Sequence, residues 1–556
     1  MTAILSKSRI LACLVVVVFG LLPGRLPAET PRASGKLSQE QLREARKEMA
    51  QRTRRVIFNN DGCDCFYYPK SEPATADGLL AKRTADLVGT QVDAIAYCTI
   101  SSGFSYFTHR TKAGTVLAHS ADTFGIRPDR RNIAKDLIDQ GTDCFQVMVD
   151  FARRNGKEIF WSMRMNDTHD VAYRPDKPHV LYPPLKQEHP EWLVGDPVKR
   201  TPYGRWSSVD YARPEIRDLA FRYLQEVCTN YDVDGVELDF FRHLCYFKSA
   251  ANGGAASQAE CDMMTDLLQR VRAMTEEVGL KRGRPILVSV RVPDSLEYCH
   301  DMGFDLARWL QEGLLDILIT TCYFRLNPWQ YSVELGHKHG VQVYPCLSDA
   351  RVKGEKRFQR ASLESYRAQA VEAWAAGADG IHLFNFPDVS SSQSPVVREV
   401  GDAQALQTRN KLYFVTVRDG SPKSWLAGGA KYRNLPVLTP THARQIVADE
   451  PLRLQIMLAE DLPAAERAGY QAKLTLHLEL PELQRPERVA VTFNGQALTG
   501  GSLVQGWLDL PLPAQCVRCG ANAIEVALQN AQTTANAKSQ GQRCSDAAVS
   551  VAYEKR

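Results

Sequence analysis

The sequence of 556 residues lacks the features that mark a nucleic-acid-binding or membrane-spanning protein. Its 68 lysine and arginine residues nearly balance 64 aspartate and glutamate residues, and it has no long basic block or basic-aromatic stripe. Nucleic acid is therefore not an expected partner. Beyond Leu22 no stretch reaches the ~18 uninterrupted apolar residues that a spanning helix needs, so we expect no membrane span in the mature chain.

A short apolar run does occur near the N-terminus. Lys7 and Arg9 precede an apolar stretch from Ile10 to Leu22, and a Pro- and Gly-containing segment follows. This pattern predicts a signal peptide over residues 1–28, cleaved after about Ala28. The mature protein is therefore predicted to be secreted or periplasmic.

Cysteine is present, but not at metal-site spacing. Of the 14 cysteines, the Cys63-x-Cys65 and Cys516-x-x-Cys519 pairs each lack a second Cys or His pair at zinc spacing. A disulfide is favoured over a metal for both in an oxidising compartment, and we predict no metal and no cofactor. The predicted buried free thiols, inside apolar strand-like runs, are Cys98, Cys322 and Cys346.

The chain is too long for one ordinary hydrophobic core, so at least two domains are expected. Residues 29–52 are polar and favour a helical lead-in. Eight apolar strand candidates follow, separated for the most part by stretches with apolar residues at helical spacing. They are Val56–Asp61, Val92–Ile100, Glu158–Asp167, Gly235–Arg242, Ile286–Pro293, Asp316–Phe324, Val341–Asp349 and Gly380–Asp388. This count predicts a (β/α)8 TIM barrel over residues 53–404.

After residue 405 short alternating strands are separated by Pro and Gly. They are Tyr413–Val417, Leu452–Leu458, Ala472–Leu480, Arg488–Phe493, Trp507–Leu512, Ala523–Leu528 and Ala547–Tyr553. The spacing predicts an antiparallel β-sandwich accessory domain over residues 405–556. The fold class is therefore α/β, with a barrel followed by a sandwich.

The fourth strand candidate carries carboxylates. Side chains alternate along a strand, so Glu237 and Asp239 point the same way, while Val236 and Leu238 point the other way. A parallel strand covered on both sides is expected to hold Val, Ile and Leu, and an ionised carboxylate there is costly unless it is paired or used. The strand therefore predicts a site.

Polar residues also gather where the other strand candidates end. In a barrel these ends converge on one rim, where active sites are built. The segment from Thr168 to Asn230 is predicted to be a long loop over this rim, and loops of such length are usually functional. No glycine occurs in Ser348–Arg351 or Asn385–Val389, so the phosphate-binding loops of other barrels are absent.

Carboxylates at strand ends, with aromatic residues in nearby loops, suit cleavage of a glycosidic bond. One carboxylate attacks or positions water, a second protonates the leaving oxygen, and aromatic faces stack on sugar rings. The sequence therefore predicts a glycoside hydrolase with a polysaccharide or oligosaccharide substrate.

Three motifs carry a family resemblance. They are His189-Pro-Glu-Trp-Leu193, Arg213-Pro-Glu-Ile-Arg217 and Tyr231-Asp-Val-Asp-Gly-Val-Glu-Leu-Asp239. In this order they resemble family ten of the glycosyl-hydrolase-like barrels, which has a "PEWL" loop, a "P-E-V-R" helix start and a "YDVDGI-x-x-D" fourth strand. The resemblance covers residues 53–390 as architecture and implies glycoside hydrolysis.

Two more distant resemblances help to assign roles. Gly235-x-Glu-x-Asp239-x-x-x-His243 is similar to the fourth-strand motif of α-amylases, in which the Asp is the nucleophile and the His contacts sugar. Glu237 stands where that family has Arg, so its mechanism does not transfer whole. The chitinase pattern also overlaps, but its essential final Glu corresponds to Phe241.

By elimination, Asp239 is the predicted nucleophile or principal carboxylate. Glu237 would orient it or hold a proton, because two like charges so close repel each other. Asp294, after the fifth strand, is the predicted acid/base. The predicted substrate-binding residues are Asn60, Asp61, Asn166, Asp167, His169, Trp192, Trp206, His243, Arg291, Tyr323, Trp329, Asp349 and Asp388.

Other interpretations stay open. Glu237 could instead form a buried salt bridge with Arg164 or Arg291, and Asp294 could simply begin a helix as its N-cap. The protein could be a non-catalytic carbohydrate-binding protein on a barrel scaffold, if the rim carboxylates are tied up in salt bridges. A metal-dependent barrel hydrolase would require convergence of Asp61, Asp167, His169 and Asp388 on a cation.

Overall fold

The computed structural model describes residues 37–99, 104–119, 125–321, 323–348, 352–386, 394–448, 450–529 and 542–556. The predicted lead-in helix is α1 (Gln39–Ala50), and its start is fixed by a capping box between Ser38 and Gln41. Over these ranges, no helix combines the length and the apolar character needed to cross a membrane.

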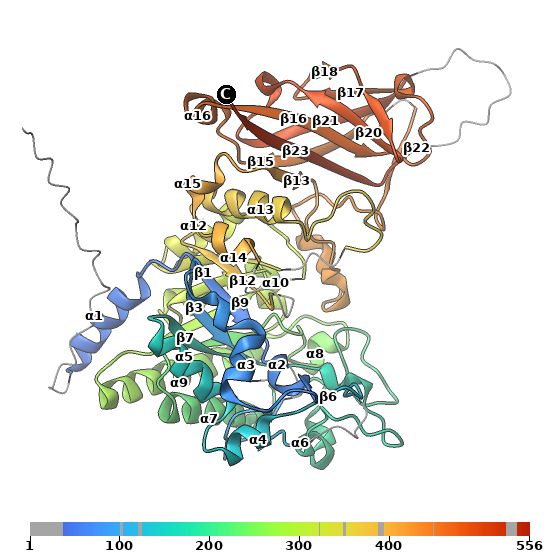
Figure 1. Ribbon diagram of the computed structural model, residues 1–556. Helices are drawn as coiled ribbons and strands as arrows, with labels where there is room; N and C mark the ends of the chain where they lie inside the picture. Colours follow the sequence, from blue (N-terminus) through green and yellow to red (C-terminus); the bar gives the residue numbers. More distant parts are fainter. Residues whose placement is uncertain are drawn as a thin grey trace, which may run out of the picture. The chain divides into compact units, whose positions relative to one another are not determined.

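All eight predicted barrel strands are present and close into one parallel barrel (Figure 1). Their order around the barrel is the order in the sequence, as short right-handed crossovers require. The strands are β1 (Val56–Asn60), β3 (Val92–Tyr97), β7 (Glu158–Arg164), β8 (Gly235–Asp239), β9 (Leu287–Val292), β10 (Ile317–Thr320), β11 (Gln342–Leu347) and β12 (Ile381–Leu383). The predicted (β/α)8 barrel is confirmed.

Helices connect the strands and bury their apolar faces against them. The principal ones are α3 (Ala76–Arg83), α4 (Ala134–Asp139), α5 (Cys144–Arg154), α7 (Pro214–Asn230), α9 (Gln258–Arg282), α10 (Leu296–Asp301), α11 (Leu306–Gln311), α12 (Trp329–His337) and α13 (Leu363–Ala375). The stretch of helical spacing between β3 and β7 forms two helices, α4 and α5, because Gly141 adopts a left-handed conformation and Asp143 caps α5.

Short elements fill the loops. They are α2 (Cys63–Phe66), β2 (Tyr68–Pro69), β4 (Tyr106–Phe107), β5 (Thr115–Val116), β6 (Arg130–Arg131), α6 (Pro184–Glu188), α8 (Lys248–Ala251), α14 (Val396–Glu399) and α15 (Ala403–Leu406).

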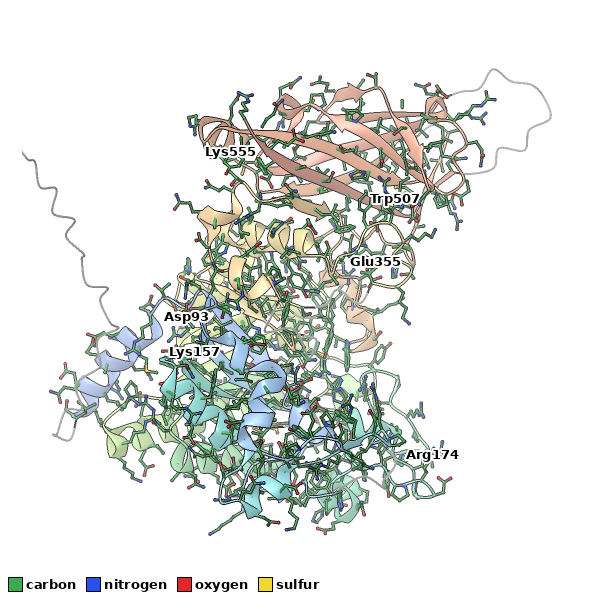
Figure 2. The ribbon with its side chains drawn as sticks, in the orientation of Figure 1. Asp93, Lys157, Arg174, Glu355, Trp507 and Lys555 are labelled. Carbon is green, nitrogen blue, oxygen red and sulfur yellow. The ribbon has the colours of Figure 1, made fainter. Side chains whose placement is uncertain are left out.

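Aromatic rings close the N-terminal end of the barrel. A Cβ on Gly235 would lie 2.3 Å from the ring of Phe160, and one on Gly380 would lie 2.5 Å from the ring of Tyr344. Glycine at these two positions therefore makes room for the rings. Figure 2 shows Asp93 and Lys157 near this end, where the Lys157 ammonium donates to the Val92 carbonyl at 2.6 Å. The polar interior described below lies toward the opposite end.

The predicted sandwich is also present, as two main antiparallel sheets. One has the order β13-β23-β16-β20-β19 and the other β15-β21-β17-β18. The strands are β13 (Lys411–Phe414), β14 (Arg444–Ile446), β15 (Leu452–Leu458), β16 (Tyr470–Glu479), β17 (Val489–Phe493), β18 (Gln496–Leu498), β19 (Ser502–Val504), β20 (Trp507–Leu512), β21 (Gly520–Leu528), β22 (Gln542–Cys544) and β23 (Asp546–Lys555), with helix α16 (Leu462–Arg467). Their inward residues form a core of their own, beside which Trp507 is buried (Figure 2).

Residues 415–441, here called the covering segment, leave β13 and contact loops of the barrel. The Tyr298 hydroxyl donates to the Pro422 carbonyl at 2.9 Å, and the Asn434 amide donates to the Leu326 carbonyl at 2.8 Å. A Cβ on Gly420 would lie 2.2 Å from the Tyr323 carbonyl oxygen. The chain after residue 405 is therefore not all sandwich, since this part packs on the barrel rim.

The cysteine predictions have mixed outcomes. Cys65, Cys516 and Cys519 are free thiols, so neither the expected Cys63–Cys65 disulfide nor the expected Cys516–Cys519 disulfide is formed. The Cys65 thiol instead hydrogen-bonds to that of Cys144, and burial adds to this bond in raising the Cys65 pKa. The predicted buried thiols Cys98 and Cys346 are confirmed, while Cys322 lies outside the described residues.

Candidate active site at the carboxyl ends of the barrel strands

Glu237 lies inside the barrel, as strand alternation predicts. It accepts hydrogen bonds from Ser162 Oγ at 2.5 Å and Asn59 Nδ2 at 3.2 Å, and its other oxygen lies 3.0 Å from His382 Nε2. Burial acts to raise the Glu237 pKa, but the bonds from His382 and Ser162 outweigh it and lower that pKa. Glu237 is thus an ionised carboxylate in a closed network, and its ion-pair partner is His382 rather than Arg164 or Arg291, which the salt-bridge alternative named.

Asp239 lies one layer nearer the rim and is fully buried. Arg164 and Arg291 are its register partners on β7 and β9. The Arg291 guanidinium donates to Asp239 Oδ2, and the backbone N–H groups of Phe241 and Arg242 each donate to Oδ1 at 3.0 Å. These three donors fix the orientation of the Asp239 carboxyl group.

The Arg291 guanidinium also packs against an aromatic ring. Its guanidinium lies 3.7 Å from the centre of the Phe384 ring, and the guanidinium of Arg242 lies 5.6 Å from the same ring. Stacking of this kind suits the flat, weakly hydrated guanidinium. The middle of the barrel is therefore a cationic layer around one aromatic ring, with the Asp239 carboxylate inserted in it.

The rim layer contains a carboxylate–imidazole pair. Asp167 Oδ1 accepts from His169 Nδ1 at 2.6 Å, and its other oxygen pairs with Arg164 at 3.2 Å. Arg242 donates to His169 Nε2 at 2.9 Å. Burial and Arg242 lower the His169 pKa, so the ring is neutral at pH 7. Its side chain is 32% exposed, whereas that of Asp167 is 1% exposed, so the imidazole is the part that a ligand can reach.

Asp167, His169 and His243 also meet a distance criterion for a cation site, since their donor atoms lie within 4.8 Å of one another. Their hydrogen bonds argue against this use. His243 Nδ1 accepts from the Thr168 backbone N–H at 3.0 Å, so Nε2 carries the proton of the neutral ring. His169 has its Nε2 lone pair occupied by Arg242. The cation reading from the sequence also needed Asp61, which pairs with Arg83.

Asp294 has a bracing position between two loops. Its carboxylate accepts from the backbone N–H groups of Leu326 at 2.9 Å and Asn327 at 2.8 Å. Burial raises the pKa of Asp294 to about 6 despite these bonds. Ser295, not Asp294, caps α10, so the alternative of a helix N-cap is wrong. The expected role of Asp294 as acid/base stays a prediction.

Two predicted sugar-binding amides are used inside the protein. Asn60 accepts from the Gly62 amide at 2.9 Å and the Arg83 guanidinium at 2.9 Å, which fixes the turn after β1. Asn166 donates to the carbonyls of Val209 and Cys245 at 2.8 and 2.6 Å, which fixes the long β7–α7 loop. Both residues are fully buried and brace these loops, and their contact with sugar stays a prediction.

The prediction that four aromatic residues bind sugar is also revised. Trp206 and Trp329 are 2% and 3% exposed and belong to the core, so neither offers a ring face to a sugar. Trp206 is held there by its indole N–H, which donates to the Val171 carbonyl at 3.1 Å. Trp192 and Tyr323 are half-buried and remain candidates. His243 is 3% exposed and so lies beneath the surface of the site.

Asp61 and Arg291 have ion-pair partners, and Asp349 and Asp388 lie outside the described residues. Burial acts to raise the Asp61 pKa, but Arg83, Arg164 and the Cys63 amide together lower it below its usual value, so Asp61 is ionised. Asp61 is 8% exposed, so its carboxylate is mostly committed to Arg83.

Three residues at the site escaped the sequence reasoning. Trp425, in the covering segment, stacks on His243 with ring centres 5.8 Å apart and an angle of 24°. No local sequence pattern predicts that Trp425 contacts a rim residue more than 180 positions earlier in the chain. His382 was recognisable in principle, since it is a titratable residue inside an apolar strand. Arg205, in the β7–α7 loop, is half-buried beside His243.

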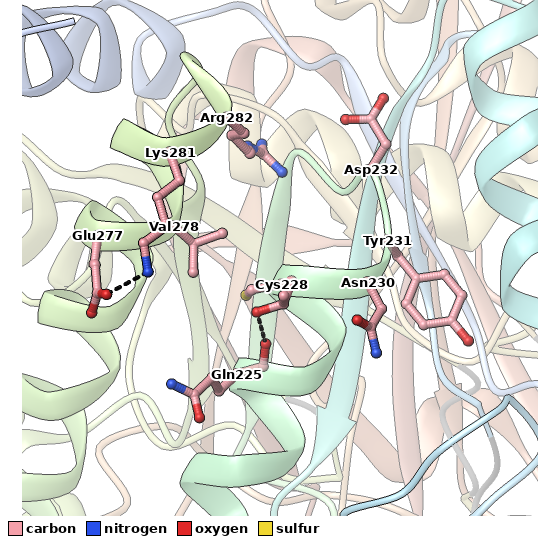
Figure 3. A pocket seen from close by; sticks show the side chains of 10 residues that line it. Gln225, Cys228, Asn230, Tyr231, Asp232, Glu277, Val278, Lys281 and Arg282 are labelled. Carbon is pink, nitrogen blue, oxygen red and sulfur yellow. Dashed lines mark hydrogen bonds and ion pairs between the residues drawn. The ribbon is translucent and has the colours of Figure 1, made fainter. Parts of the chain in front are cut away.

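A separate surface hollow of about 410 Å³ lies between the ends of α7 and α9 (Figure 3). Its lining includes Tyr231 and Asp232, which precede β8, so it is at the N-terminal end of the barrel. Glu277 and Lys281 form an ion pair at 2.6 Å on its wall. Barrel active sites form at the opposite end, so this hollow is not the candidate site.

No protein-family model matches the chain, and no curated protein sequence matches it, so the family-ten resemblance is not confirmed. Solved structures similar to it include the α-L-fucosidase isoenzyme 2 of Paenibacillus thiaminolyticus, at 13% identity and a TM-score of 0.36, covering 64% of this chain and 49% of that one. The chain thus spans about half the length of that enzyme.

Two further similar structures are shorter. The PgaB (BpsB) glycoside hydrolase domain of Bordetella bronchiseptica has 11% identity and a TM-score of 0.40, covering 63% of this chain and 99% of that one. A glycoside hydrolase family 18 N-acetylglucosaminidase of Paenibacillus barengoltzii has 12% identity and a TM-score of 0.36, with the same coverage. Since these TM-scores are below 0.5, the fold and the site depend on the strands and side chains described above.

Proposed function

We propose that the protein is an exported glycoside hydrolase that cleaves a polysaccharide or oligosaccharide at the carboxyl ends of its barrel strands. The observation that carries the proposal is the position of Asp239, at the end of the fourth barrel strand. There one guanidinium and two backbone N–H groups hold its carboxylate in a fixed position. A carboxylate fixed at the end of a barrel strand is what a nucleophile or principal catalytic carboxylate requires.

Asp294 is the proposed proton donor. Its environment differs from that of Asp239, because burial raises its pKa to about 6, whereas Asp239 has a guanidinium partner. Carboxyl groups whose surroundings differ in this way are the usual division between an acid and a base. Proton donation would require Asp294 to release the Leu326 and Asn327 amides, so movement of their loop is part of this proposal. Glu237 would support the layer beneath Asp239.

The substrate would lie across the rim. Tyr323, Trp192 and Trp425 are half-buried aromatic residues there, and such rings pack against the apolar faces of sugars. His169 offers a partly exposed imidazole, held by Asp167 and Arg242. The export and the resemblance to family ten belong to this same proposal.

A non-catalytic carbohydrate-binding function is the second candidate. It is favoured by a specific observation, namely that the described carboxylates of the barrel interior have committed partners. Glu237 is paired with His382, Asp239 with Arg291, and Asp167 with Arg164 and His169. A carboxylate that must both hold an arginine and attack a sugar has to exchange one contact for the other.

The test is release of reducing ends from a panel of plant, algal and bacterial polysaccharides. It compares the wild-type protein with Asp239→Asn, Asp294→Asn and the surface control Asp262→Asn, whose carboxylate is exposed. Hydrolysis by wild type and control, lost in the folded Asp239→Asn variant, supports the proposal. Binding of a polymer without release of sugar by any variant supports the second candidate. Equal hydrolysis by wild type and Asp239→Asn contradicts the role of Asp239.

A further inference from the structure

Arg205 is held at the rim by the local backbone. It follows Gly204, which has a φ of +67° and whose Cβ would lie 2.6 Å from that of Cys245. The Gly204 amide donates to the Ser424 carbonyl at 2.9 Å, which ties this loop to the covering segment. Glycine is required here both for the left-handed backbone and for the close approach. The position of Arg205 is therefore built into the fold.

The guanidinium of Arg205 has no carboxylate partner among the described residues. Its hydrogen bond, at 3.2 Å, goes to the carbonyl oxygen of Thr168. The two nearest acids are already committed, since Asp167 pairs with Arg164 and His169, and Asp170 pairs with Lys186. Burial lowers the Arg205 pKa and outweighs the attraction of these acids. A half-buried cation that lacks an anion is costly, and an incoming anion would offset the cost.

The surroundings of Arg205 suit a sugar as well as an anion. Thr168, whose carbonyl accepts from Arg205, donates its own amide to His243, and His243 stacks on Trp425. The guanidinium and a half-buried indole thus both lie near one imidazole. Three more cations are exposed on the same two segments, namely Lys199, Arg200 and Lys423.

The tip of the β7–α7 loop, residues 196–205, carries one acid, Asp196, against Lys199, Arg200 and Arg205. The Asp196 carboxylate accepts from the backbone amides of Val198 and Lys199 at 2.8 and 2.6 Å, so it closes a turn. Together with Lys423 on the covering segment, this tip has a net positive charge. Such a surface attracts anionic polymers from solution, with an effect that falls as salt concentration rises.

We propose that the rim binds an acidic glycan, with Arg205 pairing to the anionic substituent of one sugar and Trp425 packing on the ring. Guanidinium groups bind carboxylate and sulfate oxygens in the same bidentate manner, so the substituent is a uronate carboxylate or a sulfate ester. The inference rests on the proposed function for its substrate class. The inference does not require hydrolysis, because binding of an acidic glycan at the rim is sufficient for it.

The experiment measures polymer affinity by calorimetry in the Asp239→Asn background, so loss of hydrolysis cannot affect it. The probes are a polyuronate, the same polymer after reduction of its carboxyl groups, a sulfated galactan and its desulfated form. We expect about tenfold tighter binding of one charged polymer than of its neutral counterpart, from one charge-assisted hydrogen-bonded pair. The charged polymer preferred, carboxylated or sulfated, identifies the substituent.

Variants then assign the preference to Arg205. Arg205→Gln should abolish the preference for the charged polymer, Arg205→Lys should retain part of it, and Arg453→Gln, an exposed arginine of the sandwich, should leave it intact. Binding of charged and neutral polymers with equal affinity overturns the proposal. So does an unchanged preference in Arg205→Gln, or no binding of any of the four polymers. Melting temperature and circular dichroism verify that each variant is folded.

Discussion

Removal of either partner of the Asp239–Arg291 pair should destabilise the barrel more than removal of both. Both side chains are 0% exposed, so each single change leaves a charge in the interior without its counter-ion. Arg291→Met leaves the Asp239 carboxylate, and Asp239→Asn leaves the guanidinium facing an amide. Breaking one side of a buried pair typically costs about 3–5 kcal/mol.

The double variant should recover much of that loss. In Asp239→Asn/Arg291→Met the asparagine oxygen still accepts the Phe241 and Arg242 amides, and methionine fills the space against Phe384. The coupling energy of the cycle should therefore be roughly 2–4 kcal/mol. The exposed Arg453–Glu525 pair, with side chains 74% and 42% exposed, is the matched control and should show at most about 1 kcal/mol.

Urea unfolding followed by tryptophan fluorescence measures these energies. All eight tryptophans except Trp507 precede residue 426, so the signal reports mainly on the barrel. Additivity of the two single changes within about 0.5 kcal/mol would refute the reasoning, because it would mean that the two charges do not sense each other. The cycle also shows whether loss of activity in Asp239→Asn reflects chemistry or stability.

Further predictions concern protons, metals, thiols and packing. The Asp294 pKa is raised in the fold from 3.8 to about 6, so its contribution to stability is present below pH 4 and lost as pH rises through 6. Relative to Asp294→Asn, the wild-type protein should thus lose about 2.4 kcal/mol between pH 4 and pH 7 in urea titrations, and a constant difference would contradict the burial argument. Zinc at micromolar concentration should not raise the melting temperature, because His169 and His243 use their ring nitrogens in hydrogen bonds; stabilisation lost in His243→Gln would prove otherwise. Alkylation after denaturation without reductant should label Cys63, Cys65, Cys516 and Cys519, and a Cys63–Cys65 or Cys516–Cys519 cross-linked peptide by mass spectrometry would refute this. Gly420→Ala should displace the covering segment, because its Cβ meets the Tyr323 carbonyl, and should speed proteolysis of residues 415–441; cleavage at the wild-type rate would count against that contact.

Strand alternation predicted the barrel and the interior placement of Glu237 and Asp239, because a side chain's face follows from its own position in the strand. The partners were harder to predict. Arg291 and His382 reach these acids from β9 and β12, and sequence spacing does not reveal which of several charged residues meet across a barrel. For the same reason, the alternative in which Glu237 forms a salt bridge considered only Arg164 and Arg291 and missed His382.

The loop residues were predicted least well. A tryptophan in a loop can stack on a ligand or join the core, and the path of the loop decides between the two. Trp206 is held in the core by a hydrogen bond to the Val171 carbonyl. No sequence pattern predicts this hydrogen bond. Trp425 reaches the rim because residues 415–441 double back from the sandwich, although their Pro- and Gly-containing sequence resembles a simple linker.

The covering segment bears on how this protein can evolve. In many multidomain proteins an accessory domain can be exchanged by recombination at its linker without harm to the partner. Here a crossover after residue 404 would replace Trp425 and the Pro422 carbonyl that Tyr298 binds, and so would remove one wall of the neighbouring domain's site. The barrel and the sandwich are therefore expected to be inherited together, as a single evolutionary module.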